Sequence, residues 1–170
     1  MKFHDLLNLP YNPINSIIDL DRISDALPST PIEVSKQVYK DFGRSDIHQE
    51  VYGEIEIDKI KWSKVKLDAC DICSCFIAPD FMQYVETVSR RVKIYKDIGW
   101  DCIDSRIEVI NHWKENLTWI EAPVFIDRKL VGAENGIHLI EGHTRIGTLK
   151  GFLHNSLIEN SSQHEVWFGA

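Results

Sequence analysis

The residues best suited to chemistry form one short stretch, Gly142-His143-Thr144-Arg145. An apolar run ends just before this turn, and apolar residues with helical spacing follow it. A strand that turns into a helix at a glycine directs the first free N–H groups of that helix toward the junction. The imidazole, hydroxyl and guanidinium of the next three residues add further donors. The stretch is therefore suited to hold an anion such as a phosphate or a carboxylate.

Each side chain of the turn has two interpretations. Arg145 can grip a phosphate with two parallel hydrogen bonds, or it can pair with Glu141 or Glu165 and fasten the helix to the sheet. His143 can donate to the same anion or act as an acid or base, because its ordinary pKa is close to neutrality. It can equally serve as a local hydrogen-bonding residue of the turn. Thr144 has the residue type of a helix cap.

Phosphoryl transfer also needs a carboxylate base and a group that holds a metal ion. Glu54, Glu56 and Asp58 alternate with apolar residues, which predicts a half-exposed strand with its acids on one face. We take Glu54 as the candidate catalytic carboxylate beside His143. The alternative is that the three acids are only the solvated side of the strand.

Three of the four cysteines follow a C-x-x-C-x-C pattern, Cys70, Cys73 and Cys75. Three thiolates would need a fourth ligand to hold zinc, and Cys102 or His112 could supply it. A second ligand pair at the usual structural-zinc spacing is missing. The favoured interpretation is a set of reduced, partly buried thiols, so zinc is not expected here.

The spacing of apolar residues and the positions of capping residues predict the helices and strands that position these groups. Thr30, Pro31 and Glu33 have the spacing of a capping box, as do Asp80 with Gln83 and Ser105 with Glu108. Apolar residues of the helix after Asp80, including Tyr84, and of the helix after Ser105, from Ile107 to Leu117, are expected to face inward. Helices are expected over residues 17–27, 31–43, 80–99, 105–117 and 142–153, strands over 54–58, 122–126, 137–140 and 165–168, and a loop over 68–80. Trp62, Val65 and Leu67 either continue the strand at 54–58 or begin a second strand. This order predicts an α+β chain with one domain.

The composition narrows the class of protein. A chain of 170 residues with 44% hydrophobic and 26% charged residues suits one globular domain. The net charge of −7 disfavours a nucleic-acid partner, because phosphate backbones reward clustered lysine and arginine. Neither a membrane span nor a secretion signal is expected, which indicates a cytoplasmic protein.

The Gly142-His143-Thr144-Arg145 turn, with Pro123-Val124-Phe125-Ile126 before it, resembles the ParB/sulfiredoxin-like superfamily. The resemblance implies a small mixed sheet packed with helices over residues 51–170, and it leaves residues 1–50 as an N-terminal helical extension. It also implies that Gly142 and Arg145 contact the phosphates of a nucleotide. The turn lacks the cysteine of sulfiredoxins, and no helix-turn-helix domain follows it, so sulfinic-acid chemistry and partition-site binding are not implied. The family's alanine three residues after the arginine is replaced by Thr148.

Two functions are expected from these observations, and whether the chain is an enzyme stays open. The first is binding of ATP or another nucleotide with Mg²⁺, for phosphotransfer or hydrolysis, by Gly142, His143, Thr144 and Arg145, with Glu54 and His143 as catalytic groups. A kinase branch of the superfamily that acts on free serine has a similar G-H-x-R turn and favours this expectation. The second is a non-catalytic acidic module, such as an immunity or antitoxin protein that neutralises a basic toxin.

Overall fold

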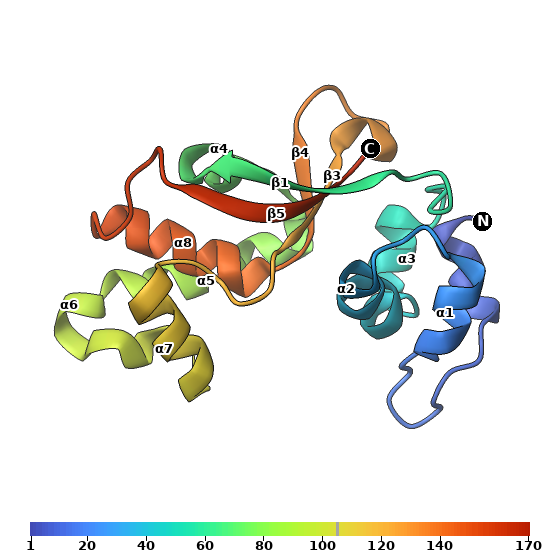
Figure 1. Ribbon diagram of the computed structural model, residues 1–170, viewed down its shortest axis with the longest axis horizontal. Helices are drawn as coiled ribbons and strands as arrows, with labels where there is room; N and C mark the ends of the chain where they lie inside the picture. Colours follow the sequence, from blue (N-terminus) through green and yellow to red (C-terminus); the bar gives the residue numbers. More distant parts are fainter. Residues whose placement is uncertain (105) are drawn as a thin grey trace. The chain divides into compact units, whose positions relative to one another are not determined.

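A computed structural model of the chain describes residues 1–104 and 106–170 (Figure 1). It confirms the α+β class, because the chain forms helices and a sheet that contains both antiparallel and parallel strand pairs. The elements in chain order are η1 (Phe3–Asn8), α1 (Leu20–Ala26), α2 (Ile32–Val34), η2 (Ser35–Lys40), α3 (Asp46–Tyr52), β1 (Trp62–Asp68), α4 (Ala69–Cys73), β2 (Phe76–Ile77), α5 (Pro79–Lys93), α6 (Tyr95–Ile98), η3 (Gly99–Cys102), α7 (Ile107–Asn116), β3 (Val124–Asp127), η4 (Arg128–Val131), β4 (Ile137–Glu141), α8 (His143–His154) and β5 (Gln163–Gly169). Among these described residues, no helix has both the length and the apolar character needed to cross a membrane.

The chain forms two compact units. Unit 1 comprises Met1–Ser63, Val124–Glu141 and Trp167–Ala170, and unit 2 comprises Lys64–Pro123 and Gly142–Val166. The strand order of the sheet is β1-β5-β3-β4-β2.

Strand β3 organises unit 1. It pairs with β4 in antiparallel fashion, with Phe125 opposite Leu139, and with the end of β5 in parallel, with Phe125 opposite Phe168. Val124 and Ile126 of β3 are fully buried and join the core that the N-terminal helices supply. That core consists of Phe3, Leu6, Ile18, Ile23, Leu27, Val34, Val38, Tyr39, Tyr52, Ile55, Ile57, Ile60, Val124, Ile126 and Ile140.

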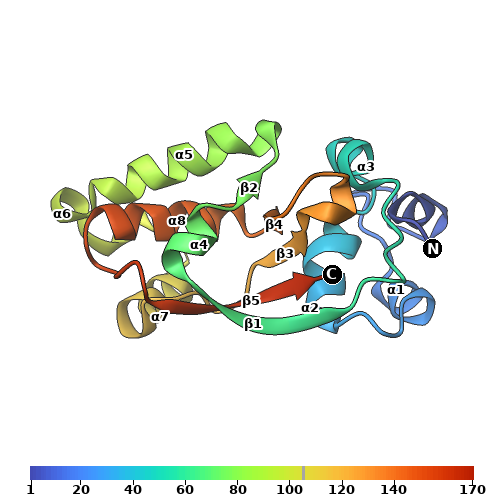
Figure 2. The ribbon, with the colours of Figure 1, turned by 90° about the horizontal axis from the view of Figure 1, so that it is seen from above.

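The central feature of unit 2 is the pairing of α5 with α8, which lie side by side (Figure 2). Two glycines of α8 allow this approach. A Cβ atom added at Gly147 would come within 2.7 Å of the Val88 Cβ, and one added at Gly151 would overlap the Cβ of Val92. The two glycines are four residues apart and therefore share one face of the helix.

We expect Gly151→Ala to lower the free energy of unfolding by about 1–3 kcal/mol, because α5 must shift to admit the new methyl group. The atoms in the way are the Val92 Cβ and the Ser89 carbonyl oxygen, which belong to or adjoin the backbone and cannot simply rotate away. Urea denaturation measures the change. The added methyl group would also lie 2.6 Å from the Val92 Cγ1, which Val92→Ala removes, so the second change should recover part of the loss. A double variant no better than the sum of the two single changes would contradict the steric explanation.

Several expected elements occur close to their predicted positions. Strands β3, β4 and β5 and helices α1, α5, α7 and α8 overlap the ranges expected for them. The predicted caps are wrong in detail. The helix after Thr30 begins after Pro31, and α5 begins with Pro79 at its first position, neither with a side-chain cap. Pro79 has no backbone N–H that would need a partner in the first turn, so it can begin α5 without a side-chain cap. The predicted cap at Ser105 lies outside the described residues.

The strand expected over residues 54–58 is wrong. Ile55 and Ile57 are buried and the acids between them are exposed, but the segment is a series of turns in which only Glu56 forms an isolated bridge, to Lys2. The Ile55 amide bonds the Tyr52 carbonyl instead of a neighbouring strand. An alternating pattern therefore arose from turns packed on a core. Of the two alternatives for the residues after it, the structure has the separate strand that begins at Trp62.

The loop expected over residues 68–80 is also wrong, because it contains α4 and β2. Ala69 and Ile72 of α4 are fully buried, and α4 packs against α8. Helix α4 has only five residues, which is too short for a periodic signal in the sequence.

Candidate functional site

The candidate site is the start of α8, where Gly142 takes the helix N-cap position with a φ of 109°. This left-handed conformation favours glycine, and a Cβ atom at Gly142 would also overlap Pro123. No side chain caps the helix. The first backbone bond of α8 joins the Ile146 amide to the Gly142 carbonyl, so the amides of the three residues between them belong to the first turn of the helix.

Two side chains of α5 contact this first turn. The Phe81 ring packs on the His143 ring with 4.3 Å between their centroids. The Tyr84 hydroxyl and the Thr144 hydroxyl share a hydrogen bond of 2.8 Å. Tyr84 is 51% exposed, which corrects the expectation that it faces the core. The side chains of His143 and Thr144 are therefore held in place by α5, a helix that begins more than 60 residues earlier in the chain.

A backbone carbonyl positions Arg145. Its Nη1 atom donates to the Glu121 oxygen at 2.7 Å, in the segment that leads to β3. A guanidinium has five N–H donors, so this bond orients the group and uses one of them. The Glu121 carbonyl is a partner that the sequence did not indicate.

The structure places the candidate carboxylate in a different unit. Glu54 belongs to unit 1 and the turn to unit 2, so the joint catalytic role of Glu54 and His143 stays a prediction. Glu54 is highly exposed and forms an ion pair of 2.6 Å with Lys2. Its hydrogen bond to the Lys2 ammonium holds the pKa of the Glu54 carboxyl below its usual value, which weakens it as a base.

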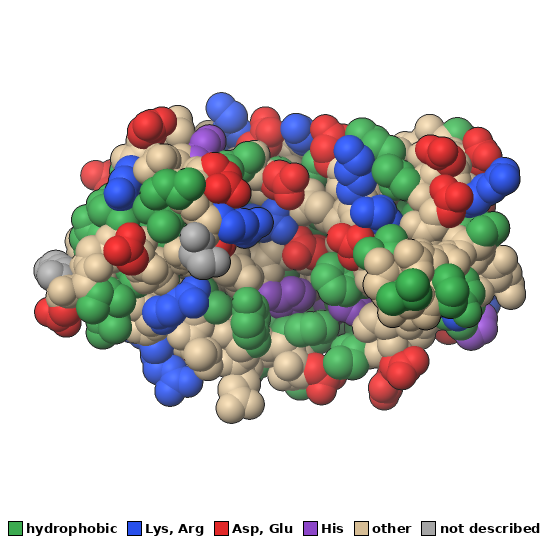
Figure 3. Space-filling view, turned by 90° about the horizontal axis from the view of Figure 1, so that it is seen from below, with side chains coloured by type: hydrophobic (Ala, Val, Ile, Leu, Met, Phe, Trp, Pro, Cys, Tyr) green, Lys and Arg blue, Asp and Glu red, His purple; other side chains and the backbone are tan. Residues whose placement is uncertain are grey.

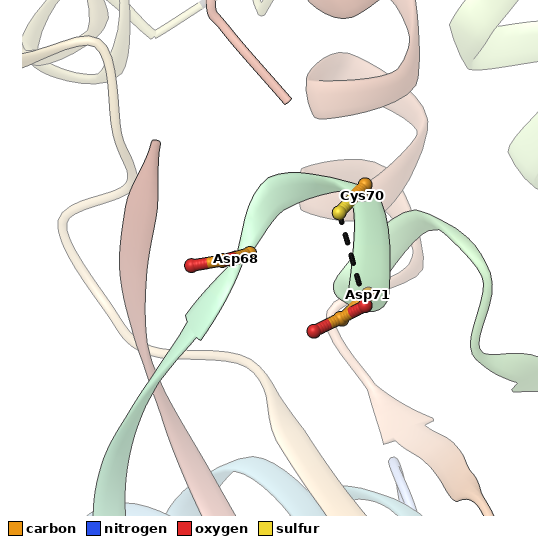
Figure 4. A group of neighbouring side chains, drawn as sticks. All are labelled: Asp68, Cys70 and Asp71. Atoms are coloured by element: carbon orange, nitrogen blue, oxygen red, sulfur yellow. Dashed lines mark hydrogen bonds between the residues drawn. The ribbon is translucent and has the colours of Figure 1, made fainter. Parts of the chain in front are cut away.

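The cysteine pattern does not gather three thiols. In the described part of the chain, the candidate group of metal-binding side chains consists of Asp68, Cys70 and Asp71, whose ligand atoms lie within 4.8 Å of one another (Figure 4). Cys73 and Cys75 do not belong to it. Burial raises the pKa of the Cys73 thiol to about 12 and that of Cys75 to about 11, which makes both poor thiolate donors.

Comparison with known proteins identifies no relative of the chain. No family model, no curated protein and no solved structure matches the chain. The resemblance of the turn to the ParB/sulfiredoxin-like superfamily therefore stays a prediction from the sequence.

Proposed function

We propose that the first turn of α8 binds the phosphate group of a small ligand such as a nucleotide. The observation that carries the proposal is an uncapped helix start at a left-handed glycine, followed directly by His143, Thr144 and Arg145. The partial positive charge of a helix N-terminus and the direction of its first N–H groups favour an anion. The resemblance of Gly142 and Arg145 to the G-x-x-R motif supports the same assignment.

The neighbours of the turn favour a ligand that carries a ring as well as a phosphate. Tyr84 presents an exposed aromatic ring beside Thr144, and flat bases stack on such rings. Arg145 is oriented by the Glu121 carbonyl, so little side-chain freedom is lost when it binds. The site therefore suits a nucleotide better than a free carboxylate.

Inorganic phosphate, ATP and CTP, the nucleotides with Mg²⁺, should be tested by thermal denaturation. We expect the matching ligand to raise the melting temperature, since binding to the folded state at 100 times Kd adds about 2.7 kcal/mol. Arg145→Ala should abolish this gain. Arg91→Ala is the matched control, because the Arg91 guanidinium also donates to a backbone carbonyl of unit 2, that of Ile103, at 3.0 Å. An equal gain in the Arg145 variant, or no gain with any ligand, would refute the proposal.

A second candidate is the binding of a basic protein, and the charge distribution favours it. Unit 1 has 14 acidic and 9 basic residues, so it carries −5 of the net charge of −7. Asp21, Asp46 and Glu50 are among its exposed carboxylates. On the face shown in Figure 3, however, both signs of charge alternate with apolar side chains. The absence of any ligand effect in the denaturation experiment, together with salt-sensitive binding to a basic protein, would favour this function.

A further inference from the structure

Strand β1 ends the sheet, with β5 as its neighbour in the strand order (Figure 2). Lys61 and Ala170 exchange both backbone hydrogen bonds, and the Ala69 amide bonds the Ser162 carbonyl. The two contacts have the same antiparallel register, so Val65 and Leu67 turn their backbone groups toward β5. The backbone groups of Lys66 and Asp68 turn toward the outer edge.

An outer edge of seven residues is long enough to pair with another strand. Such an edge accepts an extended segment by main-chain hydrogen bonds, and the side chains along it decide which segment fits. The identity of the partner therefore depends on the charges that β1 presents.

Lysines dominate this edge although the protein is acidic. Residues 59–66 contain four lysines and no acid, in a chain with a net charge of −7. Lys64 and Lys66 are exposed on β1, and Glu165 of β5 forms an ion pair of 3.4 Å with Lys64. Acidic residues return at Asp68, where the strand ends.

These lysines disfavour a second copy of the chain. If two copies paired in antiparallel fashion about Val65, Lys64 of one would lie opposite Lys66 of the other. Like charges directly opposite each other destabilise a strand pair. Carboxylates at the same positions would instead form ion pairs with both lysines.

We infer that the outer edge of β1 binds an extended acidic segment of another protein as an added strand. The segment supplies main-chain partners to Lys66 and Asp68 and carboxylates to Lys64 and Lys66. This site is separate from the phosphate-binding turn, and either can exist without the other.

A labelled peptide of about ten residues that alternates glutamate with valine tests the inference by fluorescence anisotropy. We expect Lys66→Glu to weaken binding about tenfold or more, because it replaces an attraction by a repulsion. Lys114→Glu makes the same change of charge on α7, where the side chain is exposed, and should leave the affinity nearly unchanged. Circular dichroism of each variant checks that it folds.

Hydrogen exchange separates strand addition from simple charge attraction. Bound peptide should slow exchange of the Lys66 and Asp68 amides, and a peptide with lysine in place of glutamate should give no protection. Binding without amide protection, equal affinities for the two charge variants, or dimers of the protein that pair through β1 would each overturn the inference.

Discussion

Lowering the pH from 7 to 4 is expected to destabilise unit 1 by several kcal/mol, because two histidines are buried there in the neutral form. His48 and His138 are 3% and 1% exposed. Burial lowers the pKa of each to about 4, and the charge of Arg128 adds to the effect at His138. The ordinary value for both is 6.5.

The direction of the effect follows from proton binding. Between pH 6.5 and 4 the unfolded chain binds protons at these histidines and the folded chain does not, so the free energy of unfolding falls as the pH falls. The contribution is complete above pH 6.5 and is lost by about pH 4. A shift of this size corresponds to at most about 3 kcal/mol for each histidine.

Urea denaturation at several pH values measures this dependence. His138→Gln removes one titrating group but keeps an amide that reaches the place of the histidine Nε2 and can hydrogen-bond the Tyr52 hydroxyl, which lies 2.8 Å from that atom. We expect the variant to show a shallower loss of stability between pH 6.5 and 4. An unchanged slope in the variant, or constant stability of the parent over that range, would show that His138 is not the group responsible.

The sequence predicted the strand, turn and helix around Gly142 because all of their signals are local. An apolar run, a glycine and a helical pattern follow one another within 17 residues, and β4 and α8 form there. The neighbours of the turn carry no such signal. Phe81 and Tyr84 reach it only because Gly147 and Gly151 let α8 approach α5, which depends on the packing of two distant helices.

The errors in the predicted fold arise where burial depends on more than the local sequence. The alternation of charged and apolar residues at Glu54–Asp58 indicates which side chains are buried. Turns that pack on a core can produce this pattern as well as a strand can. Helical spacing likewise predicts a helix without showing which of its apolar residues are covered. Ile107 and Leu117 were expected to face inward with Trp113, but both are exposed at the ends of α7, and Leu117 takes a left-handed conformation with a φ of 51°.

Trp113→Ala should therefore cost about 3–5 kcal/mol of unfolding free energy, whereas Ile107→Ala on the same helix should change it by less than about 0.5 kcal/mol. Trp113 is 2% exposed and packs on Phe152 with 5.2 Å between ring centroids. Ile107 is 63% exposed, so its truncation removes almost no buried surface. Urea denaturation of both variants measures the difference. Equal losses would mean that α7 buries its first turn as the sequence pattern suggested, and that the contact of Trp113 with Phe152 is not what secures this helix.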